Sequence, residues 1–253
     1  EGFSPNAITY VCALKACGIL GCIVRGEEIH ADILRTRSIG KDTLIGNSLV
    51  DMYIKCGALK KAKEVFSELQ ARNVSSWTSL ISGYAHVGEH DIVIELFKQM
   101  IEEGVEPNFI TFTVVLNACS HLGLLDHGQM YYESMCTIYG IVPSLEHQTC
   151  IVDLFARAGD FQKAVAMITK TPILDYLPMW TALLGACHKW GNVKLGRMAF
   201  YQAVELDRDC GTAYALMAEI FAAAGMLEDA NKVKDMRLHY ATWKKQKSGK
   251  FIS

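Results

Sequence analysis

The chain has 253 residues, 51% of them hydrophobic, and its 25 basic and 27 acidic side chains give a formal net charge of -2. Such an apolar composition, with only five Pro residues, excludes long disordered segments and predicts a chain that is folded from end to end. The charge excludes a surface that binds polyanions throughout, although it leaves room for local basic faces such as residues 232–250.

The longest apolar runs are far shorter than a membrane span and are broken by charged residues, so we expect no association with a membrane. The nine Cys residues form no CxxC pair and several fall inside apolar helical patterns, which favours reduced, buried thiols and a reducing compartment. The chain opens without a basic leader, so we expect any targeting peptide to lie outside this segment.

Seven glycines recur along the chain and define its units. They are Gly21, Gly57, Gly88, Gly123, Gly159, Gly191 and Gly225, and their successive separations are 36, 31, 35, 36, 32 and 34 residues. A period of this length is typical of repeats in which a pair of helices forms one unit. The glycine itself suits the left-handed backbone conformation that ends many helices.

Apolar columns flank each of these glycines. The positions 11, 7 and 4 residues before it are mostly aromatic or aliphatic, as in Trp77, Ile81 and Tyr84, and this spacing places them on one face of a helix. The position five residues after it holds Gly or Ala in six units, Val93 being the exception, and small side chains let helices approach closely. We therefore predict an all-α fold of helical hairpins that stack on their neighbours.

Short motifs distinguish the units from one another. In chain order they are Lys15-Ala16-Cys17, Thr43 to Gly57, Ser76 to Tyr84, Asn117-Ala118-Cys119, Leu145 to Leu154, Trp180 to Cys187 and Tyr214 to Val233. In this order they resemble the L, S, P, L2, S2, E1 and E2 units of plant pentatricopeptide repeat proteins, PLS class, E subgroup.

The resemblance implies a right-handed superhelical solenoid of helix-turn-helix repeats. It divides the chain into the end of a preceding repeat (1–6), an L repeat (7–42), an S repeat (43–73), a P repeat (74–108), an L2 repeat (109–144), an S2 repeat (145–176), and the E1 (177–210) and E2 (211–253) units, which resemble tetratricopeptide repeats; E2 includes a basic tail.

The same resemblance implies a function. Members of this class bind single-stranded transcripts of mitochondria or chloroplasts and select cytidines for deamination to uridine. The family's deaminase domain would follow the E units or act in trans, because none of the eight His residues begins an HxE and no CxxC completes a zinc site. We therefore predict no enzymatic activity, cofactor or metal for this segment.

The column ten residues before each glycine is polar in five of seven units, namely Asn47, Thr78, Thr113, Thr149 and Thr181. Short donor-acceptor side chains repeated on one face suit contacts with successive bases, although Asn and Thr near helix starts also serve as caps. In the resembling family this residue and the last residue of the unit select the base together. The pairs implied here are Val11 with Asp42, Asn47 with Asn73, Thr78 with Asn108, Thr113 with Ser144, and Thr149 with Tyr176.

By the resemblance, Asn47 with Asn73 favours pyrimidines, cytidine ahead of uridine, and Thr78 with Asn108 favours adenine. The other three pairs define their bases weakly. The second residue of a unit usually supplies an apolar wedge beside the base, as Ile8, Leu44 and Ile110 would. Two units depart from that pattern, with Ser75 and Glu146 at this position.

Two other classes of function compete with RNA binding. A protein-binding array of the tetratricopeptide type has an overlapping period, and E1 and E2 fit it best, so we expect them to recruit a deaminase-bearing protein. The L units are expected to dock accessory editing factors. The enzyme class depends on His30, His121, His127, His147 and His188, which lie on different repeats or lack the spacing of a site.

Overall fold

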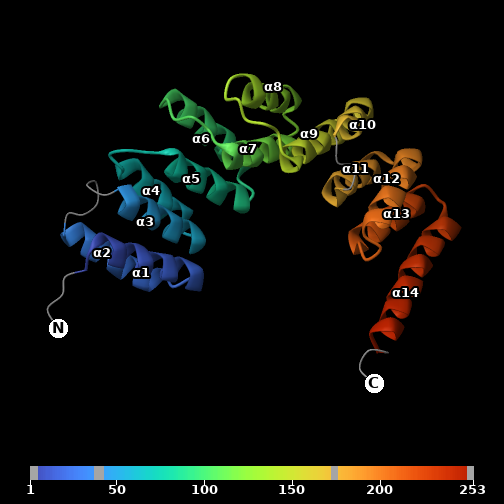
Figure 1. The fold of residues 1–253 in the computed structure, drawn as a ribbon, viewed down its shortest axis with the longest axis horizontal. Helices are drawn as coiled ribbons and strands as arrows, with labels where there is room; N and C mark the ends of the chain where they lie inside the picture. Colours follow the sequence, from blue (N-terminus) through green and yellow to red (C-terminus); the bar gives the residue numbers. More distant parts are fainter. Residues whose placement is uncertain (1–4, 37–42, 172–175, 250–253) are drawn as a thin grey trace. The chain divides into compact units, whose positions relative to one another are not determined.

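The computed structural model describes residues 5–36, 43–171 and 176–249, and their side chains as far as residue 239 (Figure 1). Within these ranges the chain forms fourteen α-helices and no strand, which confirms the all-α class. The helices are α1 (Ala7–Leu20), α2 (Ile23–Arg35), α3 (Thr43–Lys55), α4 (Leu59–Glu68), α5 (Val74–His86), α6 (His90–Glu102), α7 (Phe109–Leu122), α8 (Leu125–Thr137), α9 (Leu145–Arg157), α10 (Phe161–Lys170), α11 (Leu177–Trp190), α12 (Val193–Leu206), α13 (Gly211–Ala223) and α14 (Leu227–Gly249). None of the helices in the described part is long and apolar enough to span a bilayer.

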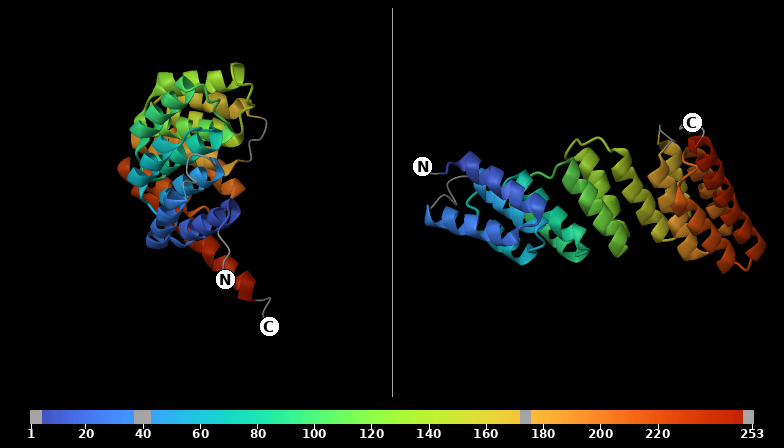
Figure 2. Two further views of the ribbon diagram at one scale, coloured as in Figure 1. Left: turned by 90° about the vertical axis from the view of Figure 1, so that its left-hand side faces the viewer. Right: turned by 90° about the horizontal axis from the view of Figure 1, so that it is seen from below.

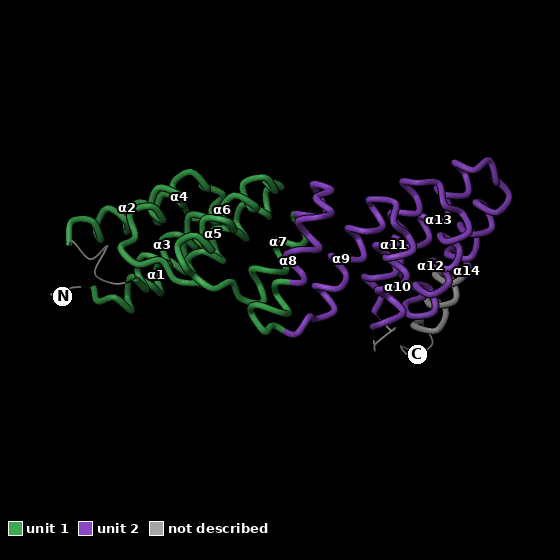
Figure 3. The backbone as a smooth tube through the Cα atoms, turned by 90° about the horizontal axis from the view of Figure 1, so that it is seen from above, with its two compact units in different colours: residues 1–118, 134–141 green, residues 119–133, 142–253 purple. Residues whose placement is uncertain are grey.

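The helices form two compact units (Figure 3). The first comprises residues 1–118 and 134–141, and the second comprises residues 119–133 and 142–253, so the division passes through α7 and α8. In the first unit α1 packs on α2, α3 on α4 and α5 on α6, while the first helices stack as α1, α3 and α5. In the second unit α9, α11 and α13 stack in the same way, with α10, α12 and α14 as their partners, as the views of Figure 2 also show.

The aligning glycines have the backbone conformation that the sequence predicts. All seven adopt positive φ angles, from 64° at Gly191 to 85° at Gly159. At Gly21 this turn lets the N–H of Cys22 donate to the carbonyl of Cys17 at 2.9 Å, which satisfies a helix-end carbonyl before α2 begins. The glycine column therefore sets the hairpin turns.

The small-residue column marks the places where helices approach most closely. A Cβ atom on Gly26 would lie 2.5 Å from Sδ of Met52, and one on Gly128 would lie 2.3 Å from Cδ2 of Leu154. Real Cβ atoms essentially never lie so close to another atom, so a larger residue would require the Met52 or Leu154 side chain to move. Val93, the exception in this column, is also fully buried.

Five of the seven positions in the aromatic column hold buried aromatic residues: Tyr10, Trp77, Phe112, Trp180 and Tyr214. Trp77 and Phe112 are almost completely buried, and their rings meet Phe66 and Phe97 edge to face at centroid distances of 4.7 and 5.6 Å. Gly46 occupies the aromatic position of the repeat formed by α3 and α4, where Leu69 fills the space that a larger side chain would take. The polar columns lie near the starts of the first helices, outside this aromatic core.

Candidate nucleic-acid interface

The last residue of several units is the N-cap of the next first helix. Asn73 caps α5, with Oδ1 accepting from the backbone N–H of Ser76 at 3.0 Å, and Asn108 accepts in the same way from Thr111 at 2.9 Å. Ser144 caps α9 in a reciprocal arrangement with the buried His147. Helix capping was the alternative role expected for the column that contains Asn47 and Thr78. In the structure the column of last residues, which contains Asn73, Asn108 and Ser144, performs this capping instead.

The structure brings Asn47 and Asn73 together. Nδ2 of Asn47, in the second turn of α3, donates to Oδ1 of Asn73 at 3.3 Å across two successive hairpins. Oδ1 of Asn73 therefore accepts from the Ser76 N–H and from the Asn47 amide, and its own Nδ2 takes part in neither bond. Oδ1 of Asn47 is buried and has no hydrogen-bond partner in the described structure.

Thr78 and Asn108 are joined through a third residue. The hydroxyl oxygens of Thr78 and Thr111 are 2.8 Å apart, and the Thr111 hydroxyl donates to Oδ1 of Asn108 at 2.9 Å. Thr78 is only 8% exposed and Thr111 is fully buried, whereas Asn108 is half-buried. The side chain accessible from outside is therefore mainly that of the capping Asn.

The other threonines of the column bond to their own helices. The hydroxyls of Thr113, Thr149 and Thr181 donate to the carbonyls four residues earlier at 3.1, 2.7 and 3.2 Å. Val11 is buried, Tyr176 precedes α11 without a side-chain cap bond, and Asp42 lies outside the described residues. Thr113 and Ser144 belong to different compact units.

The predicted wedge residues leave large apolar side chains on the surface. Ile8, Leu44 and Ile110 are 68%, 55% and 53% exposed, and each lies in the first turn of a first helix. Each wedge position precedes the polar column of its own unit by three residues, a spacing that puts both on one helix face. Ser75 and Glu146, which depart from the wedge pattern, are exposed as well.

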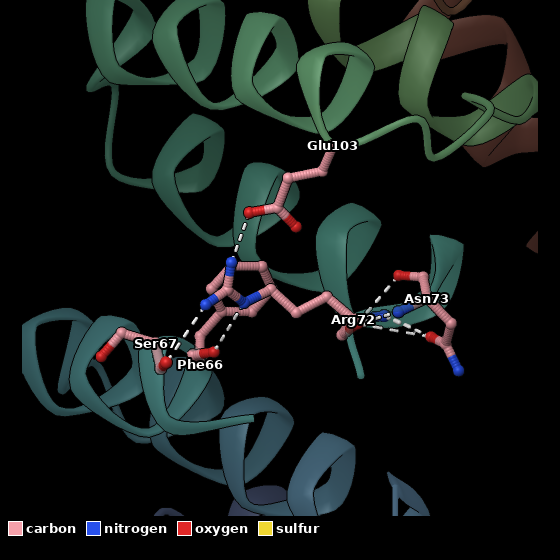
Figure 4. A network of polar contacts seen from close by, with 6 residues as sticks. Phe66, Ser67, Arg72, Asn73 and Glu103 are labelled. Carbon is pink, nitrogen blue, oxygen red and sulfur yellow. Dashed lines mark hydrogen bonds and ion pairs between the residues drawn. The ribbon is translucent and has the colours of Figure 1, made fainter. Parts of the chain in front are cut away.

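A clasp beside Asn73 was missed by the sequence analysis (Figure 4). The guanidinium of Arg72 donates to the carbonyls of Phe66 and Ser67 at 3.2 and 3.1 Å, lies 5.2 Å from the ring centroid of Phe66, and pairs with Glu103. It thereby ties the end of α4 to the end of α6 immediately before the capping Asn. The only signal in the sequence is one Arg in a short inter-repeat linker.

The histidines that suggested an enzyme have structural partners. Nδ1 of His30 lies 2.8 Å from the Tyr53 hydroxyl, His147 belongs to the Ser144 cap, and His188 pairs with Glu219 at 3.4 Å. No group of three His, Cys, Asp or Glu residues within the described ranges is placed to hold a metal. The fourteen helices account for most of the described residues.

Two repeat families match the chain over its central part. The PPR repeat family matches residues 72–121, and the PPR repeat matches residues 47–74 and 110–138. The chain carries pentatricopeptide repeats. A pentatricopeptide repeat-containing protein of Arabidopsis thaliana is 40% identical over 91% of this chain and 46% of its own length. A chloroplastic relative from the same plant is 38% identical over 92% of this chain and 26% of its own length, and a mitochondrial one is 36% identical over 93% and 51%.

Solved structures share the fold of this pentatricopeptide repeat chain. The pentatricopeptide repeat protein PPR10 from maize, in complex with an 18-nt psaJ RNA element, aligns over 94% of this chain and 41% of its own, with a TM-score of 0.60 and 14% identity. The APC/C hetero-tetramer Cut9-Hcn1 aligns over 92% and 46%, with a TM-score of 0.51 and 15% identity. At these identities the likeness shows the fold alone.

Proposed function

We propose that this chain binds single-stranded RNA through the first helices of its hairpins, with one base for each unit. The observation that carries the proposal is the pairing of two columns at successive hairpins: Asn47 bonds to Asn73, and Thr78 reaches Asn108 through Thr111. Selection of a base by two residues per unit requires such pairing. Exposed apolar wedges on the same helix faces supply surfaces on which unstacked bases can pack.

The hydrogen-bond polarity of the second pair favours adenine. Oδ1 of Asn108 accepts from both the N–H and the hydroxyl of Thr111, so Nδ2 of Asn108 is the donor left for a base. Adenine offers an acceptor, N1, at the centre of its Watson–Crick edge, whereas guanine offers the donor N1–H. The Nδ2 donor of Asn108 can therefore bond to N1 of adenine, whereas it meets the N1–H donor of guanine unfavourably.

The first pair favours cytidine by the same reasoning. With Oδ1 of Asn73 occupied by two donors, its Nδ2 faces the base, and cytosine presents the acceptor N3 where uracil presents N3–H. Asn47 is longer than Thr78 and leaves less room at the base, which favours the smaller pyrimidine ring. The two readers therefore share a donor and differ in the space beside it.

We further propose that the whole protein selects cytidines for C-to-U editing in mitochondrial or chloroplast transcripts. The chain spans 46% or less of several of its Arabidopsis thaliana relatives, so the deaminase would come from a further domain or from a partner. The order of the L, S, P and E units supports this assignment, and some relatives carry mitochondrial or chloroplastic names. Accessory editing factors at the L units complete the proposed set of partners.

The second candidate function, a protein-binding scaffold, is favoured at E1 and E2. An open groove of about 970 Å³ lies between α12, α13 and α14, with Tyr201 (60% exposed) and Met236 (44% exposed) in its lining. Large exposed apolar side chains in a groove are typical of docking surfaces. We assign RNA to the first helices of the PLS units and protein docking to this groove.

The substitution Asn108→Asp tests the RNA-binding proposal. Asp retains the helix cap but replaces the outward donor with an acceptor, so the preferred base at one nucleotide should change from adenine to guanine. The change should reach about tenfold, because a good base contact discriminates by about 1–3 kcal/mol. Binding is measured on single-stranded RNAs that carry each of the four bases at each position.

The matched control is Asn6→Asp, because Asn6 caps α1 with the same geometry, its Oδ1 accepting from Thr9 N–H at 2.9 Å. The control should leave the preference at that nucleotide unchanged. Equal binding of all RNAs by the unsubstituted chain, or an unchanged preference in the Asn108 variant, would overturn the proposal and leave protein binding as the better assignment.

A further inference from the structure

Thr111 lies at the centre of the adenine reader without belonging to either predicted column. Its hydroxyl oxygen is 2.8 Å from that of Thr78, 2.9 Å from Oδ1 of Asn108 and 3.4 Å from the backbone N of Asn108. Its backbone N–H also donates to Oδ1 of Asn108 at 2.9 Å. The side chain is fully buried, so it contacts the two reading residues from behind.

The number of protons fixes the direction of each bond. Oδ1 of Asn108 can only accept, so the single proton of the Thr111 hydroxyl belongs to that bond. The bond between the two threonine hydroxyls then needs the proton of Thr78. The Thr78 hydroxyl is thus a donor towards the interior and retains only lone pairs for any other partner.

The equivalent hydroxyls elsewhere bond within their own caps. Ser76 accepts from the backbone N of Asn73 at 2.9 Å and donates to its carbonyl at 2.8 Å, and Thr9 donates to Oδ1 of Asn6 at 3.0 Å. A cap therefore forms without a bond to the preceding hairpin. The Thr111 hydroxyl differs because it also bonds to the hydroxyl of Thr78, which lies 33 residues earlier in the chain.

We propose that Thr111 is a positioning residue for base selection, which keeps the Thr78 hydroxyl an acceptor towards the base. The inference rests on the proposed RNA-binding function. An acceptor beside the Asn108 amide matches the exocyclic amino group of adenine and repels O6 of guanine. Without Thr111 the Thr78 hydroxyl can rotate and donate to O6, so the reader loses part of its discrimination against guanine.

The test compares Thr111→Val with Thr111→Ser in the full chain, using single-stranded RNAs with adenine or guanine at the nucleotide that Asn108→Asp identifies. Val keeps the shape and removes the hydroxyl, so the preference for adenine over guanine should fall about three- to tenfold, the effect of one net hydrogen bond. Ser should retain the preference within about twofold. Preferences at the other nucleotides should not change.

Thr9→Val is the matched control, because it removes a capping hydroxyl of the same geometry where no reader of the described chain depends on it. It should leave base preference unchanged, and it should lower thermal stability less than Thr111→Val does, because Thr9 is exposed and Thr111 is fully buried. A double-mutant cycle gives the second readout: in a Thr78→Val background, Thr111→Val should no longer alter the ratio of adenine to guanine binding.

An unchanged ratio in folded Thr111→Val, or an equal loss at every nucleotide, would overturn the inference while leaving the proposed function intact. Absence of any base preference in the unsubstituted chain would instead overturn the proposed function. If Thr111→Val does not fold, the ratio of adenine to guanine binding is measured instead for the single variant Thr78→Val and for the double variant Thr78→Val, Thr111→Ser. A difference of more than about twofold between these two variants would refute the action of Thr111 through Thr78.

Discussion

Replacing Arg72 by Ala should destabilise the first compact unit by about 2–4 kcal/mol, far more than removing its ion-pair partner. The guanidinium donates to the carbonyls of Phe66 and Ser67 at the end of α4, and each such bond contributes about 0.5–1.5 kcal/mol. Its position over the Phe66 ring adds about 0.5–1 kcal/mol. The pair with Glu103 adds about 0.2–1 kcal/mol, because the two side chains are 26% and 39% exposed and solvent screens them.

The assay is urea unfolding followed by circular dichroism at 222 nm, with Arg72→Ala, Arg72→Lys and Glu103→Gln compared in one chain. Glu103→Gln should cost at most about 1 kcal/mol, and Arg72→Lys should fall between the other two, because Lys keeps the charge but lacks the planar fork that reaches both carbonyls. A loss in Glu103→Gln as large as that in Arg72→Ala would refute the reasoning and make the ion pair the main component of the clasp.

Two further predictions concern the glycine and cysteine columns. Gly57→Ala should lower the free energy of thermal unfolding by about 1–2 kcal/mol, because a Cβ atom is crowded at its φ of 76°. Gly185 lies in the interior of α11 with no atom within 4 Å of an added Cβ, so Gly185→Ala should be neutral or stabilising by up to about 1 kcal/mol. Equal effects of the two substitutions would contradict this account. Iodoacetamide at pH 8 should label the exposed Cys12 and Cys22 in the folded chain. It should label Cys119 and Cys187 only after unfolding, because burial raises the pKa of these two thiols to about 12. Detection of modified Cys119 in the folded chain by mass spectrometry would contradict this prediction.

The hairpin architecture could be predicted because it depends on short-range constraints that repeat. A left-handed turn needs glycine, and helices in close contact need Gly or Ala, so both requirements recur at fixed offsets, as at Gly57 and Ala62. The pairing of Asn47 with Asn73 came from the family resemblance and not from the pattern alone. The division into two compact units has no signal that we found in the sequence.

The inward hydrogen bonding of the proposed base-reading residues was not predictable from the columns. Thr78 looks like an outward polar residue in the sequence, yet its proton is bonded to Thr111, 33 residues later, and it is nearly buried. The column that contains Thr111 has a hydroxyl in only three of seven units, at Thr9, Ser76 and Thr111, so the pattern does not single out Thr111. The contacts of Arg72 could not be predicted either, because two of its partners are backbone carbonyls, which every residue has.

The fold itself does not decide between RNA and protein as the partner, since PPR10 bound to RNA and Cut9-Hcn1 align with nearly the whole chain. The decision depends on what the helix starts present. The groove near Tyr201 combines exposed apolar side chains such as Met236 with charged residues, a mixture that suits protein docking. The first helices instead carry exposed apolar residues such as Leu44 beside polar pairs in which Oδ1 of the capping Asn is already an acceptor, as at Asn73 and Asn108. In the proposed function these two pairs present the Asn Nδ2 donor to a base, and single-stranded RNA supplies planar edges that carry matching acceptors.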